Sequence, residues 1–229
     1  MVFDVNILII FGVFMLLSWL VGNRLKSKFA KYSRMGLRSG LSGREIAEKM
    51  LRESGVSGVR VISTPGKLTD HYNPLDKTVN LSPDVYSGRS ISAAAVAAHE
   101  CGHAVQHARA YSFLKMRSAL VPVISVSSRY MQWILLIGIF TVQTFPGILL
   151  AGIIMFAMTT LFSFITLPVE FDATKRALGW LRETGLTVGE EHGYAKDALK
   201  WAALTYVVAA LASLATLLYY IMIFLGSRR

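Results

Sequence analysis

The sequence predicts a mostly α-helical membrane protein with about four transmembrane helices and a small α+β module on the cytoplasmic side. Of its 229 residues, 53% are hydrophobic and only 17% are charged. The mean hydropathy of +0.47 lies well above that of soluble proteins. A polar stretch with mixed helix and strand patterns separates the first two apolar segments, and this stretch predicts the α+β module.

Four apolar segments predict the membrane spans, because each is close to the roughly 20 residues that a bilayer requires. They are Val5 to Gly22, Ser118 to Phe140, Ile148 to Leu167 and Ala202 to Leu225. The segment Thr141 to Gly147, which contains Pro146 and Gly147, turns the second span into the third. A second span that began after Arg129 would have only about a dozen residues, too few to cross, so we expect Arg129 at membrane depth.

The distribution of basic residues predicts the orientation. No Lys or Arg lies in Met1 to Asn6 and no Ala-x-Ala site follows, so the first span is expected to be an anchor and not a cleaved signal. All Lys and Arg residues except Arg129, Arg228 and Arg229 fall in two regions, residues 23–117 and 168–201. The positive-inside rule places both regions in the cytoplasm and the amino terminus outside.

The formal charge of +10 does not call for a nucleic-acid partner. Cytoplasmic loops that face anionic lipid account for it more simply, so we expect no nucleic-acid binding. The two cytoplasmic regions and the spans are expected to form a single membrane-embedded domain over residues 1–229.

The polar region after the first span begins with a predicted helix. Ser42-Gly43-Arg44-Glu45 is a capping-box pattern, and the apolar stripe that follows ends at Gly55. The alternating residues Val59 to Ser63 predict a strand. Leu68 to Tyr72 and Lys77 to Ser82 predict a hairpin. The second hairpin strand is either an exposed edge that pairs with an extended peptide or an ordinary strand inside the sheet.

The sequence His99-Glu100-Cys101-Gly102-His103 carries the chemistry. Ser90 followed by an Ala-rich run predicts a helix, on which histidines at i and i+4 share one face and can bind one Zn²⁺. Glu100, beside that face, is placed to take a proton from the attacking water and pass it to the leaving amine. This is the chemistry of peptide-bond hydrolysis.

A catalytic zinc needs a third protein ligand and an open fourth position. Glu170, after the third span, is our choice. Asp172 faces Lys175 and Arg176 on the same helix and is a better ion-pair partner. His107 lies about 12 Å from His99 along the helix, so we interpret it as a structural or supporting residue. We interpret four further polar residues as solvated loop residues: Glu183, Glu190, Glu191 and His192.

These residues resemble the YugP-type neutral zinc metallopeptidases of bacterial membranes. The similarity covers most of the chain from Gly66 onward, through four segments: Leu68 to Tyr72, Val79 to Ser82, Ala97 to His107 and Leu167 to Ala173. The order of motifs is also similar to the HtpX and CAAX prenyl protease families. In those families a Glu-x-x-Ala-Asp segment after the membrane spans supplies the third ligand.

The resemblance implies a zincin-like catalytic module in which Glu170 is a metal ligand and Ala173 matches the alanine. Thr174 stands where those relatives have the Asp that orients a ligating histidine. Asp172, Asp70 or a carbonyl group is left to replace that carboxylate.

Two residues of the hairpin, His71 and Tyr72, are candidates to stabilise the oxyanion, with structural packing as the alternative. Cys101 is the only cysteine, so no intrachain disulfide is expected, as suits a reducing cytoplasm.

The sequence therefore predicts a multi-pass zinc endopeptidase of the inner (plasma) membrane, with Zn²⁺ as cofactor and its site facing the cytoplasm. Membrane-associated or misfolded proteins are the expected substrates. A metal or solute transporter is the first alternative, but apart from Arg129 the spans carry no charged residue to line a path. A catalytically silent scaffold in a quality-control complex is the second.

Overall fold

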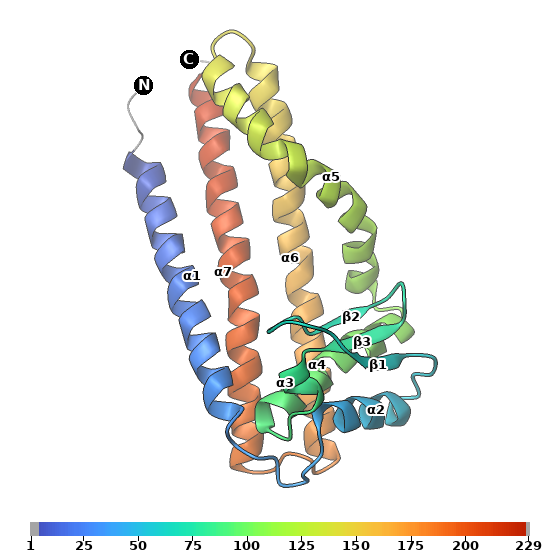
Figure 1. Ribbon diagram of the computed structural model, residues 1–229. Coiled ribbons are helices and arrows are strands. Elements are labelled where there is room, and N and C mark those ends of the chain that lie inside the picture. Colours follow the sequence, from blue (N-terminus) through green and yellow to red (C-terminus); the bar gives the residue numbers. More distant parts are fainter. Residues whose placement is uncertain (1–4, 228–229) are drawn as a thin grey trace. The chain divides into compact units, whose positions relative to one another are not determined.

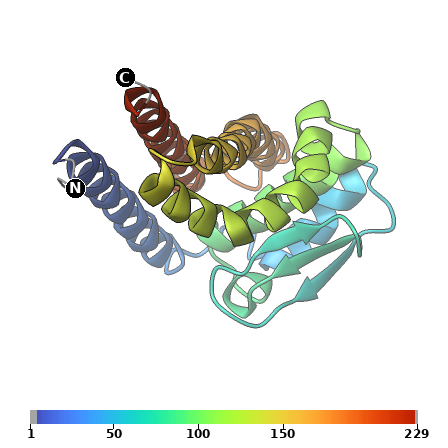
Figure 2. The same ribbon diagram turned by 90° about the horizontal axis from the view of Figure 1, so that it is seen from above.

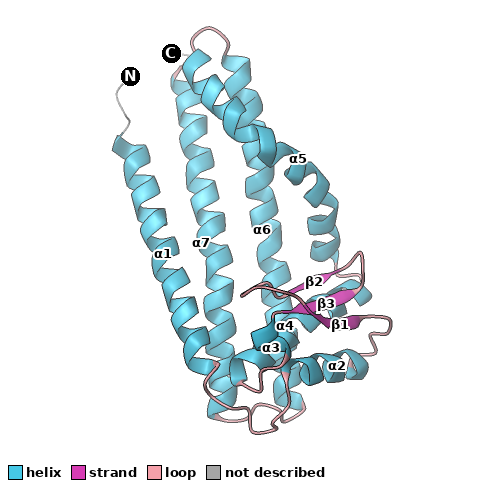
Figure 3. Ribbon diagram, viewed as in Figure 1, coloured by secondary structure: helices cyan, strands magenta, loops and turns pink. Residues whose placement is uncertain are grey.

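The computed structural model describes residues 5–227; the predictions that concern Met1 to Asp4, Arg228 and Arg229 lie outside them. The described chain is mostly helical with one small sheet, as predicted (Figures 1 and 3). The elements in chain order are α1 (Val5–Tyr32), α2 (Gly43–Glu53), β1 (Arg60–Ser63), β2 (His71–Asn73), β3 (Thr78–Leu81), α3 (Pro83–Tyr86), α4 (Ile91–Ala108), α5 (Ser112–Thr141), α6 (Pro146–Glu183) and α7 (Glu190–Gly226).

The chain divides into two compact units. Of the described residues, one contains 5–20, 115–167 and 205–227, and we call it the apolar unit. The other contains Val21–Leu114 and Pro168–Leu204, and we call it the α+β unit because it holds the whole sheet.

Four helices, α1, α5, α6 and α7, are long and apolar enough to cross a membrane. They include the four predicted spans, but each helix extends beyond its span. For example, α6 continues past Pro168, where we expected the span to end. A proline inside a helix removes one backbone hydrogen bond, and the helix resumes when the following turns are well packed. Glu170 and the residues after it therefore lie on a continuous helix.

Small residues bring helices together inside the apolar unit. A Cβ atom on Gly138 of α5 would lie 2.6 Å from Cα of Leu149 on α6, so the two helices meet closely near the turn that joins them. Further along, Thr160 of α6 and Ser213 of α7 share a hydrogen bond of 2.7 Å. The predicted turn over Thr141 to Gly147 is confirmed, since α5 ends at Thr141 and α6 begins at Pro146.

The α+β unit begins with the predicted capped helix. Ser42 and Glu45 form a complete capping box at the start of α2. The buried face of α2 is the predicted apolar stripe, consisting of Ile46, Ala47, Met50 and Leu51. This face packs into a core with Val79 and Leu81 of β3 and with the small residues of α4.

The sheet has the order β1-β3-β2 and is seen from above in Figure 2. β3 pairs in parallel with β1 and antiparallel with β2, so the predicted hairpin is confirmed. One of the two interpretations offered for the second hairpin strand is wrong. β3 is the central strand and its residues are buried, so it presents no edge to a peptide. The sheet edges belong to β1 and β2.

Candidate metal centre

Helix α4 is the buried centre of the α+β unit. Ser90 caps its first turn by accepting a hydrogen bond from the Ala93 amide. Its first sixteen residues, from Ile91 to Gln106, are buried except for His99, which is partly exposed. Most of them are small, so neighbouring elements can approach the helix on several sides. As predicted, the helix continues through His107.

Gly102 sets the distance between α4 and α6. A Cβ atom at this position would lie 2.7 Å from the carbonyl oxygen and 3.1 Å from Cα of Ala173. Real Cβ atoms do not make such contacts, so the backbones can meet here only because residue 102 is glycine. Gly102 precedes His103 and Ala173 is one turn after Glu170, so this contact brings the predicted ligands together.

His99, His103 and Glu170 form one cluster. Their ligand atoms all lie within 4.8 Å of one another. The Oε2 atom of Glu170 is 3.2 Å from Nε2 of His99 and 3.7 Å from Nε2 of His103. Glu170 is only 3% exposed, so its charge is removed from water and is balanced by the two imidazoles.

The geometry of this cluster fits zinc. A tetrahedral ion with bonds of about 2.0 Å holds its ligand atoms about 3.3 Å apart, close to the separations of 3.2 and 3.7 Å between Glu170 and the two histidines. Two imidazoles and one carboxylate are a donor set of catalytic zinc sites, which leave a fourth position open. His99 is partly exposed, so the cluster is not sealed from solvent.

Gln106 fixes the orientation of His103. Its Oε1 atom lies 3.0 Å from Nδ1 of His103, and its amide nitrogen donates to the Val169 carbonyl and to Asp172, each at 2.8 Å. Asp172 in turn accepts from Arg176 at 2.6 Å. With Nδ1–H donating to Gln106, the Nε2 atom of His103 is free to bind a metal.

Gln106 did not appear among the residues selected from the sequence. Its position offered a signal, because it lies three residues after His103, on the same side of an Ala-rich helix. The expected pairing of Asp172 with Arg176 is present, and Asp172 also supports His103 through Gln106.

Thr174 itself occupies the place next to His99. Its Oγ1 atom lies 3.3 Å from Nδ1 of His99, so a hydroxyl group stands where the HtpX-type pattern has a carboxylate. Of the alternatives considered, Asp70 is used elsewhere, since it accepts from the amide and hydroxyl of Ser82. Asp172 contacts Gln106 and Arg176 and supports the other histidine.

Glu100 lies on α4 between the two histidines and is 8% exposed. In contrast to Glu170, it forms no ion pair with any residue in the described range. Burial alone would lower the pKa of His103. The hydrogen bond to Glu170 and the negative charges of Glu100 and Glu170 outweigh burial and raise this pKa above its usual value.

Neither His107 nor His71 of the hairpin belongs to the cluster. His107 bonds through Nδ1 to the Tyr72 hydroxyl at 2.8 Å and is not one of the three clustered residues, so it does not act as a ligand there. His71 is turned back to the Thr69 carbonyl at 2.7 Å. Of the two hairpin candidates, only Tyr72 thus has a side-chain bond to the metal-bearing helix. Cys101 is buried and contacts the Ala47 carbonyl, as a packing residue would.

The expectation that Glu183, Glu190, Glu191 and His192 are loop residues is wrong, because all four lie in helices. Glu183 ends α6, whereas Glu190, Glu191 and His192 lie in the first turn of α7. Glu191 accepts a hydrogen bond from the Arg38 amide, and His192 bonds to Thr187. None of the four belongs to the cluster of His99, His103 and Glu170.

Comparisons with known proteins identify the family. A family model described as "Putative neutral zinc metallopeptidase" matches residues 7–225. The chain is 42% identical over 205 residues to the "Putative membrane protease YugP" of Bacillus subtilis (strain 168), an alignment that covers 90% of each protein. No solved structure matches the chain. The chain therefore belongs to this zinc metallopeptidase family, and the family and the relative together support a protease.

Proposed function

We propose that this protein is a zinc-dependent membrane endopeptidase in which His99, His103 and Glu170 bind the metal. The observation that carries the proposal is that three ligand atoms lie within 4.8 Å of one another. Two of the residues that supply them, His99 and Glu170, are 71 positions apart in the sequence. Each histidine also has a partner for its second ring nitrogen, Thr174 or Gln106, as ligating histidines require.

In the proposed mechanism, bound zinc supplies a Lewis acid that activates a water and polarises the scissile carbonyl. Glu100 takes the proton of the attacking water and passes it to the departing amine. Its lack of an ion pair within the described residues leaves both carboxylate oxygens available for this transfer. Gln106 and Thr174 hold the two imidazoles in one tautomer throughout. Tyr72, held by His107, is the residue we assign to donate a hydrogen bond to the developing oxyanion.

We place the α+β unit, a zincin-like module, on the cytoplasmic side of the inner membrane, with the four apolar helices as spans of a single membrane-embedded domain. The basic flank of the first span supports this orientation. Proteins that are membrane-associated or misfolded are the substrates we propose, because a protease anchored by four spans meets such chains at the membrane surface.

The Glu100→Gln variant tests the proposal. The amide takes no proton at neutral pH, whereas the metal ligands are untouched, so zinc content should stay at the wild-type level. Hydrolysis of casein or of a fluorogenic peptide should fall by about 10²- to 10⁴-fold. Glu183→Gln, which changes an exposed carboxylate outside the cluster, is the matched control. Hydrolysis by Glu100→Gln at the wild-type rate would contradict the proposed mechanism with Glu100 as the base. Absence of hydrolysis by both the wild type and this variant would favour the silent scaffold.

A further inference from the structure

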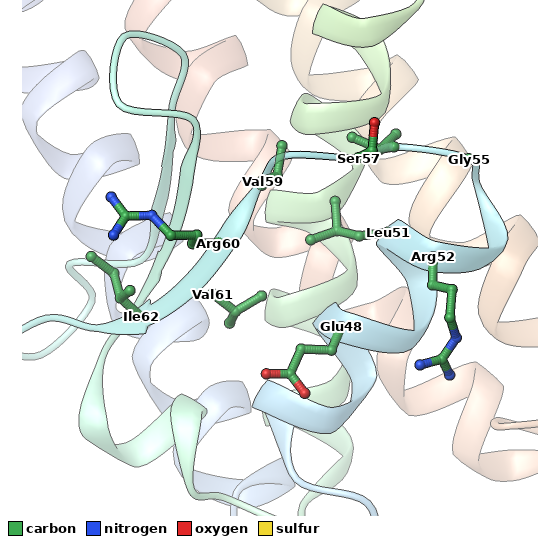
Figure 4. Close-up of a pocket in the computed structure, with 10 residues that line it drawn as sticks. Glu48, Leu51, Arg52, Gly55, Ser57, Val59, Arg60, Val61 and Ile62 are labelled. Carbon is green, nitrogen blue, oxygen red and sulfur yellow. The ribbon is translucent and has the colours of Figure 1, made fainter.

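A pocket in the α+β unit lies apart from the metal cluster, between the C-terminal part of α2 and strand β1 (Figure 4). Its volume is about 700 Å³. The lining residues are Glu48, Leu51, Arg52, Gly55, Val56, Ser57, Val59, Arg60, Val61 and Ile62. In Figure 4 the side chains of Leu51 and Val61 point toward each other across the space between helix and strand. The floor of the pocket is therefore apolar.

One edge of β1 is open beside this pocket. Within the described residues β1 pairs only with β3. The amides of Arg60 and Thr64 donate to the carbonyls of Lys77 and Leu81 at 3.0 and 2.8 Å, so both residues face β3. Because backbone groups alternate in direction along a strand, Val61 and Ser63 point their N–H and C=O groups away from β3. These groups can pair with another extended chain.

The charges around the pocket are uneven. Glu48 is held by Arg44 at 2.7 Å, so its negative charge is already balanced. Arg52 and Arg60 form no ion pair with any other residue of the described chain. Figure 4 shows their side chains on either side of the Leu51–Val61 pair. The pocket thus offers an apolar floor with two available cations at its rim.

We propose that β1 and this pocket bind an extended acidic segment of a protein partner, which adds to the sheet as a fourth strand. Backbone hydrogen bonds to Val61 and Ser63 supply affinity, and the pocket selects the side chain that enters it. An apolar residue of the segment faces Leu51 and Val61. Its two neighbours in sequence project to the other face, where Arg60 and the exposed Ile62 lie, so acidic residues are favoured there.

This inference does not depend on the proposed protease chemistry, because no metal ligand or catalytic residue lines the pocket. It describes a docking site for a partner chain, and no residue of the metal cluster lines it. β1 lies at the opposite edge of the sheet from β2, which carries Tyr72.

The test uses full-length protein in detergent micelles and a fluorescein-labelled synthetic peptide that alternates Leu with Glu. Fluorescence anisotropy measures the dissociation constant. Ser63→Pro removes the outward N–H donor at an edge position where proline is tolerated. It should weaken binding about tenfold, the effect of losing one backbone hydrogen bond and its neighbouring contacts. Ser63→Ala retains the N–H and should bind like the wild type.

Two further measurements do not depend on how well Ser63→Pro folds. A peptide N-methylated at alternate residues cannot pair along a strand edge and should bind wild-type protein at least about tenfold more weakly. Arg52→Glu combined with Arg60→Glu should weaken binding of the Glu peptide and strengthen binding of a Lys peptide, whereas Arg34→Glu should change neither. Absence of binding by the wild type, or binding insensitive to N-methylation and to the two arginines, would overturn the proposal.

Discussion

The α+β unit is built around a buried hydrophobic core, whereas the helices of the apolar unit leave many large hydrophobic side chains exposed. In α4 the run from Ile91 to Gln106 is buried at every position except His99. In α5, only Leu135 and Gly138 are buried, and Trp133 and Phe140 are 60% and 62% exposed. Exposed aromatic and aliphatic residues over a whole helix are unfavourable in water and favourable in lipid.

The difference shows that two kinds of constraint act on one chain. The apolar unit needs helices of sufficient length and hydrophobicity, a requirement that many sequences meet. The α+β unit must hold three ligand atoms a few ångströms apart, and it does so through backbone contact between α4 and α6 at Gly102 and Ala173. Substitutions should therefore have different consequences in the two units, and the predictions below test this in order of expected effect.

The largest expected effect is all-or-none, and it tests whether the apolar unit is surrounded by lipid in the proposed orientation. Single cysteines at Ser39 and at Thr144 are introduced into a Cys101→Ala background. Both positions are exposed. Ser39 is a better labelling position than Ser42, because Ser42 is buried at the N-cap of α2. An impermeant thiol reagent added to intact cells should label position 144 and spare position 39.

Permeabilised cells provide the control for this experiment, since both positions should then react. Labelling of position 39 with protection of position 144 in intact cells would reverse the orientation. Labelling of both positions in intact cells would place Ser39 and Thr144 on the same side. The second span, which lies between them in the sequence, would then not cross the membrane.

The second prediction compares the close contacts of the two units. Gly102→Ala forces α4 and α6 apart and should lower the free energy of unfolding by about 1–3 kcal/mol, with loss of zinc. Gly138→Ala, which in the apolar unit meets Leu149 at 2.6 Å, should also destabilise the protein but keep its zinc. Thermal melts in detergent and elemental analysis measure both quantities.

Gly179→Ala is the neutral control in the same helix as Ala173. The nearest atom to its added Cβ is Oε1 of Glu183 at 3.9 Å, so the methyl group fits and helix propensity favours it by up to about 1 kcal/mol. Full zinc occupancy in Gly102→Ala would show that the backbone contact does not position Glu170.

The third prediction concerns the partners of the two histidines. Gln106→Leu removes the acceptor for His103 and the link to Asp172, and it should weaken zinc binding by about 10- to 100-fold. Thr174→Val removes a single, longer contact of 3.3 Å and should have a smaller effect. Competition with a chromogenic chelator gives both affinities. An unchanged zinc affinity in Gln106→Leu would exclude the proposed role of this side chain.

Much of this arrangement could be predicted from local sequence patterns. The capping box of α2, the hairpin and the helix of His99 and His103 each depend on residues close together in sequence, and all three are present. The predicted spans cover only part of the long helices, because hydrophobicity marks where lipid is favourable and not where a helix ends. The helix α6 continues past Pro168 into polar residues that hydrophobicity does not detect.

Other features required the folded chain. The order of the strands depends on pairing between β1 and β3, and β2 lies between these two strands in the sequence. The central, buried position of β3 therefore could not be predicted from its own residues. The role of Gln106 depends on Val169 and Asp172 of another helix. From the sequence, Thr174 only replaces the carboxylate of the HtpX-type pattern. In the fold its hydroxyl group lies 3.3 Å from Nδ1 of His99.

The central claim is that packing of α4 against α6 makes Glu170 the third metal ligand, and zinc content tests it most directly. Glu170→Ala, Asp172→Ala and His107→Ala are purified under the same conditions and subjected to elemental analysis. Glu170→Ala should be nearly metal-free, while Asp172→Ala and His107→Ala should retain much of their zinc, because they lose at most a supporting contact. Full zinc in Glu170→Ala, with little in one of the other two, would contradict the claim and assign the ligand to that residue.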